Sequence, residues 1–216
     1  MNRTEEYPSL YDRLGAIIYD FGAPAVFFPV GGIDGLREQA LDALEIREGS
    51  DVLELGCGTG ALTAKLIRRG ANVIAIDRSE AMLRLARRRA PSATFVRCDI
   101  LNFKCARKFD RVLLAFVLHH LESQGRVAAL RLASSMLSSD GSIGILDWSE
   151  PAGTSLRWAL RTFIALVEPS SAMDWLERGF AIHLEQSGLH TLRSCDLAKG
   201  VARVVIAAPT KSAMLP

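Results

Sequence analysis

Three short stretches of the sequence carry residue types that could bind a ligand or move a proton. A glycine-rich stretch runs from Gly56 to Gly60 and follows Glu54, an aspartate stands at Asp77, and two adjacent histidines stand at His119-His120. Glycine permits positive φ and lets a ligand touch the main chain, whereas a carboxylate accepts hydrogen bonds from hydroxyl and ammonium groups. Imidazole titrates near neutral pH and can serve as a base. These residues indicate a binding loop with a proton-transfer group nearby.

The glycine stretch alone allows two kinds of ligand. Gly56-x-Gly58-x-x-Ala61 matches the relaxed dinucleotide fingerprint, with Asp77 as the ribose acid about 20 residues on. However, the carboxylate of Glu54 would repel a pyrophosphate at short range, and it suits a ligand that carries an ammonium group and a sulfonium. The charge therefore favours S-adenosylmethionine (SAM) over a dinucleotide.

Short apolar runs alternate with segments of helical periodicity, which predicts the elements that position these residues. The predicted strands are 52–55, 73–76, 94–98, 112–116, 142–147 and 202–208, and the predicted helices are 33–44, 62–69, 79–89, 124–137 and 173–187. Ser79 is expected to cap the helix that follows it. This alternation predicts an α/β fold with a mostly parallel sheet and helices on both faces. Such sheets bind ligands outside the carboxyl ends of their strands.

The chain resembles the class I SAM-dependent methyltransferases over roughly residues 31 to 208. The resemblance rests on an ordered series of motifs, namely Glu54-Leu55-Gly56-Cys57-Gly58-Thr59-Gly60, Ile76-Asp77-Arg78-Ser79, Val96-Arg97-Cys98-Asp99-Ile100, Phe109-Asp110-Arg111-Val112 through to Leu121, and Asp140-Gly141-Ser142. It implies a Rossmann-like, doubly wound, seven-stranded sheet that is mostly parallel with an antiparallel last strand. It also implies an enzyme that uses SAM as methyl donor and releases S-adenosylhomocysteine.

The resemblance also implies where the cofactor lies. The loop glycines would contact its methionine part, Glu54 its amino end and Asp77 its ribose hydroxyls. Asp99 would accept from the adenine amine. The complete cofactor-binding set implied in this way is Glu54, Gly56, Cys57, Gly58, Thr59, Gly60, Asp77, Arg78, Met82, Asp99, Ile100, Ala115 and Phe116. Structural alternatives stay open: a cap or solvated strand end for Asp77, a turn for Asp99, and core packing for Met82.

Methyl transfer from a sulfonium depends mainly on alignment, so a base is needed only where the acceptor must lose a proton. His119 and His120, just past the fourth predicted strand, are the catalytic candidates; capping and packing are the alternative. Trp148, in the stretch 147–150 after the fifth strand, is expected to contact the acceptor, as are Tyr11 and Tyr19. No metal site is predicted, because the four cysteines at 57, 98, 105 and 195 have no short pairing.

With 216 residues, of which 49% are hydrophobic, the sequence can build one folded domain and is not that of a disordered protein. We expect an N-terminal cover segment over residues 1–30 and a methyltransferase domain over 31–216, with a second cover inserted at 151–170. The insertion places Leu156, Leu160, Phe163 and Val167 on one helical stripe. These apolar covers favour a small, mainly apolar or aromatic acceptor.

Within the family, the chain is similar to the ubiquinone and menaquinone C-methyltransferases and to bacterial phospholipid N-methyltransferases. His119-His120 replaces the Arg-Asn pair that is usual in the quinone enzymes, which argues against quinone methylation itself. Three alternatives stay open: a phospholipid amine N-methyltransferase in peripheral contact with a membrane, an RNA methyltransferase that uses the ten Arg or Lys of residues 78–111, and a non-catalytic binding module.

The remaining expectations concern partners and location. The net charge of +2 favours no nucleic-acid partner. With no targeting or membrane-spanning segment evident and no cysteine framework, a cytoplasmic protein is expected. The methylated atom and the oligomeric state stay open.

Overall fold

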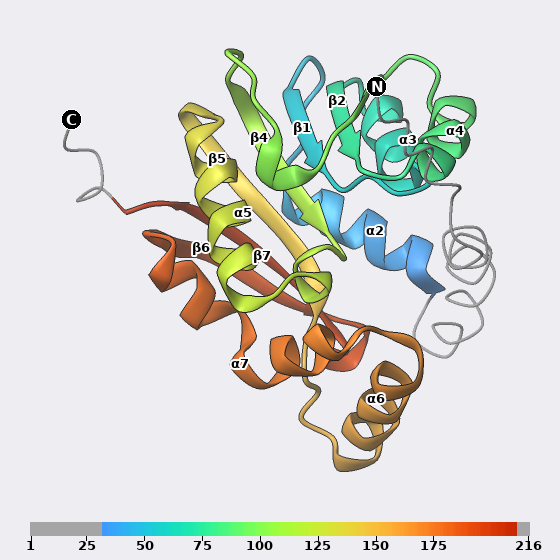
Figure 1. Cartoon of the computed structure of the whole chain (residues 1–216), viewed down its shortest axis with the longest axis vertical. Helices are drawn as coiled ribbons and strands as arrows, with labels where there is room; N and C mark the ends of the chain where they lie inside the picture. The colour runs from blue at the N-terminus through green and yellow to red at the C-terminus, as the bar shows by residue number, and fades with distance from the viewer. Residues whose placement is uncertain (1–31, 211–216) are drawn as a thin grey trace, which may run out of the picture.

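A seven-stranded sheet forms the centre of the computed structural model, which describes residues 32–210 (Figure 1). The strand order is β3-β2-β1-β4-β5-β7-β6. The first five strands run parallel, and β7 is antiparallel to both β5 and β6. The bounds are β1 Asp51–Leu55, β2 Asn72–Asp77, β3 Thr94–Arg97, β4 Phe109–Ala115, β5 Leu137–Trp148, β6 Leu189–Leu197 and β7 Ala202–Pro209. The doubly wound, mostly parallel sheet with an antiparallel last strand is therefore confirmed.

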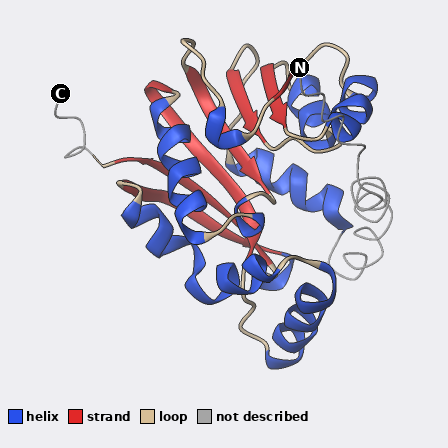
Figure 2. Cartoon of the chain, viewed as in Figure 1, coloured by secondary structure: helices blue, strands red, loops and turns tan. Residues whose placement is uncertain are grey.

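Helices cover both faces of the sheet, as predicted. They are α2 Gly32–Ala43, α3 Ala61–Arg68, α4 Glu80–Arg89, α5 Ser123–Ser135, α6 Thr154–Val167 and α7 Ser170–Gln186. In Figure 2, α5 and α7 lie in front of the sheet and α2 lies behind it. The expected cap of α4 is confirmed, because the Ser79 hydroxyl accepts a hydrogen bond of 3.4 Å from the N–H of Met82.

The predicted insertion at 151–170 contains α6, which projects from the body of the fold (Figure 1). Leu160 and Ile164 are the buried residues of this helix, whereas Val167 is 44% exposed. The helix therefore buries Ile164, one turn after Leu160, and leaves the Val167 end of the predicted stripe at the surface. The cover expected over residues 1–30, with Tyr11 and Tyr19, lies outside the described residues.

Among the described residues, none of the helices combines the length and the apolar character needed to span a bilayer. The strands β1, β2 and β3 all end on the same side of the sheet as β4, because they are parallel. Their carboxyl ends therefore bring the glycine loop, Asp77, Asp99 and the histidines to one edge.

Candidate functional site

The loop between β1 and α3 is folded back onto the end of β2. Four of its main-chain N–H groups donate hydrogen bonds within the protein: Gly56 and Cys57 to the carbonyl of Ile76, Gly58 to Oδ2 of Asp77, and Gly60 to the carbonyl of Cys57, each at 2.9 Å. A loop that binds pyrophosphate needs such N–H groups free to point at the phosphate oxygens. These four donors are already used, so the geometry favours a ligand other than a dinucleotide.

The three loop glycines have positive φ, and they differ in what a side chain at each position would meet. A Cβ on Gly56 would lie 2.6 Å from Cγ2 of Val117, and a Cβ on Gly60 would lie 2.8 Å from the Cα of Ala86. A Cβ on Gly58, at φ +51°, would meet nothing within 4 Å. Gly56 and Gly60 therefore serve close packing, and Gly58 presents the open face of the loop.

Asp77 ends β2 and supports this loop. Its Oδ2 accepts from the Gly58 N–H at 2.9 Å, and its Oδ1 accepts from the Ser79 N–H at 2.8 Å. Burial raises the pKa of the Asp77 carboxyl, and these two backbone donors oppose that rise. A carboxylate has about four lone-pair sites, so both oxygens keep acceptor capacity for the hydroxyls of a ligand.

Glu54 lies near the end of β1 and is only 2% exposed. The hydroxyl of Thr63 donates to its Oε2 at 2.6 Å. Burial raises the pKa of Glu54 to about 7, and the Thr63 hydrogen bond opposes the rise. A positively charged ligand group beside this carboxylate would favour its ionised form.

The residues predicted at the adenine end lie beside the loop at the ends of β2 and β3. Asp99 is exposed, and its Oδ1 accepts from the N–H of Leu101 at 2.9 Å, so it caps the short helix η2, Ile100–Asn102. Ile100 comes within 3.5 Å of a Cβ built on Gly56. Met82 is half-buried and Arg78 is exposed. The turn expected as the alternative for Asp99 is present, and one of its oxygens remains available.

The end of β4 holds an aromatic residue in an uncommon conformation. Phe116 has φ +54°, which is rare for a bulky residue, and its N–H donates to the carbonyl of Leu146 at 2.7 Å. Its ring contacts the buried ring of Trp148 at 5.1 Å between centroids, and Trp148 in turn contacts Phe163 of α6 at 6.0 Å. Backbone strain of this kind concentrates at functional sites. Ala115, which precedes Phe116, is half-buried.

His119 lies in η3, Leu118–His120, and its side chain is fully buried. Its Nδ1 lies 2.6 Å from Oδ1 of Asp147, a fully buried residue of β5. The main-chain N–H groups of Leu118 and His119 donate to Oδ2 of Asp147 at 3.0 and 3.3 Å. Sequence reasoning placed Asp147 in the stretch 147–150 beside the expected acceptor contact Trp148, and it did not predict the contact with His119. Because β4 and β5 are parallel neighbours, residues that follow their carboxyl ends lie side by side, and this adjacency could have predicted the contact between His119 and Asp147.

Glu168, which follows α6, completes the surroundings of the histidines. Its Oε2 lies 3.5 Å from Nε2 of His119, and the two imidazole rings of His119 and His120 lie 4.0 Å apart. Sequence reasoning missed Glu168, because it is distant along the chain and belongs to none of the family motifs.

The two histidines have opposite protonation preferences. Burial alone would lower the pKa of His119, but the carboxylates of Asp147 and Glu168 hold that pKa at about 9. His120 is exposed at the surface, but the protein atoms crowded around its ring and the charge on His119 lower its pKa to about 4. Burial would raise the pKa of Glu168, but His119 holds it below its usual value. At neutral pH, His120 is therefore the neutral imidazole of the pair.

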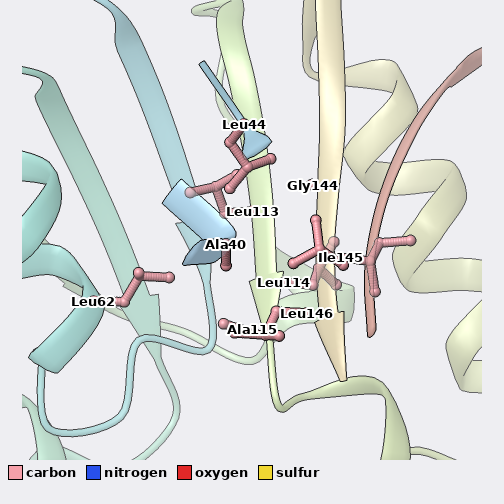
Figure 3. Close-up of a pocket in the computed structure, with 10 residues that line it drawn as sticks. Ala40, Leu44, Leu62, Leu113, Leu114, Ala115, Gly144, Ile145 and Leu146 are labelled. Atoms are coloured by element: carbon pink, nitrogen blue, oxygen red, sulfur yellow. The ribbon is translucent and has the colours of Figure 1, made fainter. Parts of the chain in front are cut away.

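An apolar cavity lies apart from these polar groups, between α2 and the sheet (Figure 3). Ala40 and Leu44 line it from one side, and Leu113, Gly144 and Ile145 line it from the other. Its volume is about 10 Å³, roughly the space of a single water. The cavity is too small for a cofactor and has no polar partner for one.

Comparison with known proteins gives a consistent set of matches. Residues 52–141 match the family model described as "Methyltransferase domain". A demethylmenaquinone methyltransferase of Beutenbergia cavernae is 30% identical over 172 residues, which cover 74% of this chain and 71% of that protein. An uncharacterized methyltransferase of Alkaliphilus oremlandii is 34% identical over 106 residues. The match spans about half the length of this curated relative, namely 49% of it.

Solved structures share the fold over most of the chain. The 1,6-didemethyltoxoflavin-N1-methyltransferase of Burkholderia thailandensis, solved with 1,6-didemethyltoxoflavin and S-adenosylhomocysteine, superposes with a TM-score of 0.67. The two proteins are 19% identical, and the superposition covers 98% of this chain and 92% of that one.

Proposed function

Because the chain belongs to the class I SAM-dependent methyltransferases, we propose that it transfers a methyl group from SAM to a small, mainly apolar or aromatic molecule. The cofactor residues proposed are those that the family motifs imply. The observation that carries the donor site is the buried carboxylate of Glu54 beneath a loop whose N–H groups are used internally. This arrangement suits a ligand with an ammonium group and ribose hydroxyls, and it offers little to a pyrophosphate.

The donor fits the described residues. The open face of Gly58 allows the ligand to lie against the main chain, and Asp77 is held by two backbone donors with its remaining lone pairs available. Glu54 regains its charge when an ammonium group lies beside it. When bound, SAM supplies an electrophilic methyl group on a sulfonium sulfur.

The acceptor is proposed to lie at the carboxyl ends of β4 and β5. The aromatic residues Phe116, Trp148 and Phe163 form a contiguous apolar cluster there, which suits a flat or lipophilic molecule. His120 is exposed and neutral, and its ring lies 4.0 Å from that of His119. We therefore place it as the group that takes a proton from an acceptor hydroxyl or activated carbon, although its lowered pKa makes it a weak base in the free protein. His119, held between two carboxylates, is proposed as a positioning residue and not as the base.

The proposal is tested by measuring S-adenosylhomocysteine release across phenols, quinols, amines and thiols. We expect turnover with at least one aromatic acceptor, and a lower kcat with an unchanged SAM Kd in His120→Ala. His190→Ala is the matched control, because His190 is exposed on β6. A protein that binds SAM but turns over no acceptor of any class would instead support the non-catalytic module.

A phospholipid amine acceptor is the second candidate, since α6 presents exposed apolar side chains. Trp158 is 71% exposed and Leu166 is 80% exposed. Such residues on an amphipathic helix favour contact with a membrane surface. Vesicles that contain amine headgroups belong in the same turnover screen, and binding to vesicles lost in Trp158→Ala would favour this acceptor.

An RNA acceptor is less favoured by the contacts of the cationic stretch. Several cations of residues 78–111 form contacts within the protein, among them Arg87 with Glu80 and Arg107 with Asp51. Arg111 donates to the carbonyl of Leu44. These contacts use part of the charge that would otherwise attract a polyanion.

Asp77→Ala is expected to weaken SAM binding by about 1–3 kcal/mol, since it removes the acceptor for the ribose hydroxyls and the support of Gly58. Asp140→Ala is the matched control, because Asp140 is an exposed aspartate of β5 outside the proposed cofactor site, and its replacement should leave SAM affinity unchanged. Isothermal calorimetry measures both variants. Equal affinity of Asp77→Ala and the wild type would remove Asp77 from the cofactor site.

SAM affinity is expected to rise with pH up to about 7, the pKa of Glu54 in the free protein. Below that pH, Glu54 must release its proton to face the ammonium group, so affinity falls by up to about tenfold per pH unit. Calorimetry in buffers of different ionisation enthalpy will detect the released proton. Glu54→Gln should bind SAM more weakly, and its affinity should not fall as the pH drops below 7. A wild-type affinity that stays constant below pH 7 would contradict the role of Glu54.

A further inference from the structure

Three potential metal-ligand side chains converge beside the aromatic cluster. The ligand atoms of His119, His120 and Glu168 all lie within 4.8 Å of one another. Within the part of the chain that the structure describes, Nε2 of His119 is buried and has no hydrogen-bond partner. The Oε2 of Glu168 lies 3.5 Å from this nitrogen. A buried nitrogen without a partner is costly, and here it points toward two further ligand atoms.

The surrounding structure fixes the orientation of this cluster. In the neutral ring that a metal ion binds, the proton on Nδ1 of His119 is donated to Asp147 over 2.6 Å and the lone pair of Nε2 is directed at the cluster, so metal binding displaces the second proton of His119. The Ser171 hydroxyl donates to the carbonyl of His119 at 2.8 Å, which ties η3 to α7. The N–H of Glu168 donates to the carbonyl of Ile164 at 2.9 Å, so Glu168 continues from the last turn of α6. The ligands are thus mounted on elements that hold one another in place.

We propose that His119, His120 and Glu168 bind a divalent first-row transition metal ion, for which Zn²⁺ is the probe; His120 is then a ligand when the ion is bound and a free base only in the metal-free protein. Imidazole nitrogen and carboxylate oxygen bind zinc at about 2.0–2.2 Å, and tetrahedral geometry then separates neighbouring ligand atoms by roughly 3.4 Å. The His119–Glu168 separation of 3.5 Å already fits this value. Only small side-chain movements are needed to bring all three atoms from within 4.8 Å to bonding positions.

The proposed site has further features of a metal centre. Metal-bound histidines generally donate their other ring N–H to a carboxylate, and Asp147 is placed to accept it from His119. Two imidazoles and one carboxylate suit zinc, iron and similar ions better than magnesium or calcium. Three protein ligands leave at least one position open, which is the composition of a catalytic site and not of a closed structural one.

The test is calorimetry with Zn²⁺ on the full chain, after treatment with a chelator. One ion is expected to bind per chain, and Co²⁺ should give the visible spectrum of a site with nitrogen and oxygen ligands. Glu168→Gln and His120→Ala should each lower the Zn²⁺ affinity by more than about 100-fold, since even loss of an outer-shell partner costs 10–100-fold. Circular dichroism will confirm that both variants fold.

Matched controls separate this site from adventitious binding. His190→Ala and Glu185→Gln change exposed residues of the same types and should leave Zn²⁺ affinity unchanged. Binding that persists in Glu168→Gln and His120→Ala but disappears when the cysteines are alkylated would overturn the proposal. Absence of any stoichiometric binding would overturn it as well. Neither result touches the donor site, which is measured separately by SAM binding.

Discussion

Replacing Asp147 by alanine is expected to lower the free energy of unfolding by about 3–5 kcal/mol. Asp147 is fully buried and accepts hydrogen bonds from the main-chain N–H groups of Leu118, His119 and Trp148 at 3.0, 3.3 and 2.8 Å. Its Oδ1 also lies 2.6 Å from Nδ1 of His119. Alanine leaves these donors buried without an acceptor and removes the charge that compensates the His119 imidazolium. The expected loss of stability is large because several hydrogen-bond donors lose their acceptor at one point of the core.

Urea unfolding followed by circular dichroism measures this effect. Asp147→Asn keeps one acceptor oxygen, so its loss of stability should be smaller than that of Asp147→Ala. Asp140→Ala is the matched control on the same strand, because Asp140 is exposed and its replacement should change stability by less than about 0.5 kcal/mol. An Asp147→Ala protein with a wild-type unfolding midpoint would show that water replaces the carboxylate at no cost.

The fold was predictable from the sequence wherever burial follows the local pattern. The strands β1 and β4 are apolar runs buried on both faces, and the prediction placed them within a few residues. By contrast, β6 was absent from the strands read from the sequence. It is the edge strand, and its residues between Leu189 and Leu197 are exposed, so no hydrophobic period marks it. Its existence followed only from the family resemblance.

The candidate site was predictable where a single motif contains it. The glycine loop and Asp77 meet because β1 and β2 are adjacent parallel strands, and the spacing of the sequence reflects that geometry. The contact of Glu168 with His119 depends on how α6 returns to the sheet, which no local pattern encodes. The opposite pKa shifts of His119 and His120 depend on the same contact. Two adjacent histidines therefore differ in protonation because residues distant along the chain surround them differently.

Gly60→Ala is expected to destabilise the protein by about 2–4 kcal/mol, since two costs combine. The new Cβ would lie 2.8 Å from the Cα of Ala86, and this backbone atom moves only if α3 and α4 separate. The positive φ of +74° adds strain for any residue with a side chain. Thermal and urea unfolding measure the loss.

Gly58→Ala is the matched partner of this variant in the same loop. Its φ of +51° carries a similar strain, but the added Cβ meets nothing within 4 Å, so stability should fall by only about 1 kcal/mol. The methyl group would instead occupy the open face of the loop and weaken SAM binding measured by calorimetry. If Gly58→Ala binds SAM as well as the wild type does, the cofactor does not lie against this face. If both variants lose equal stability, backbone strain outweighs the contact between α3 and α4.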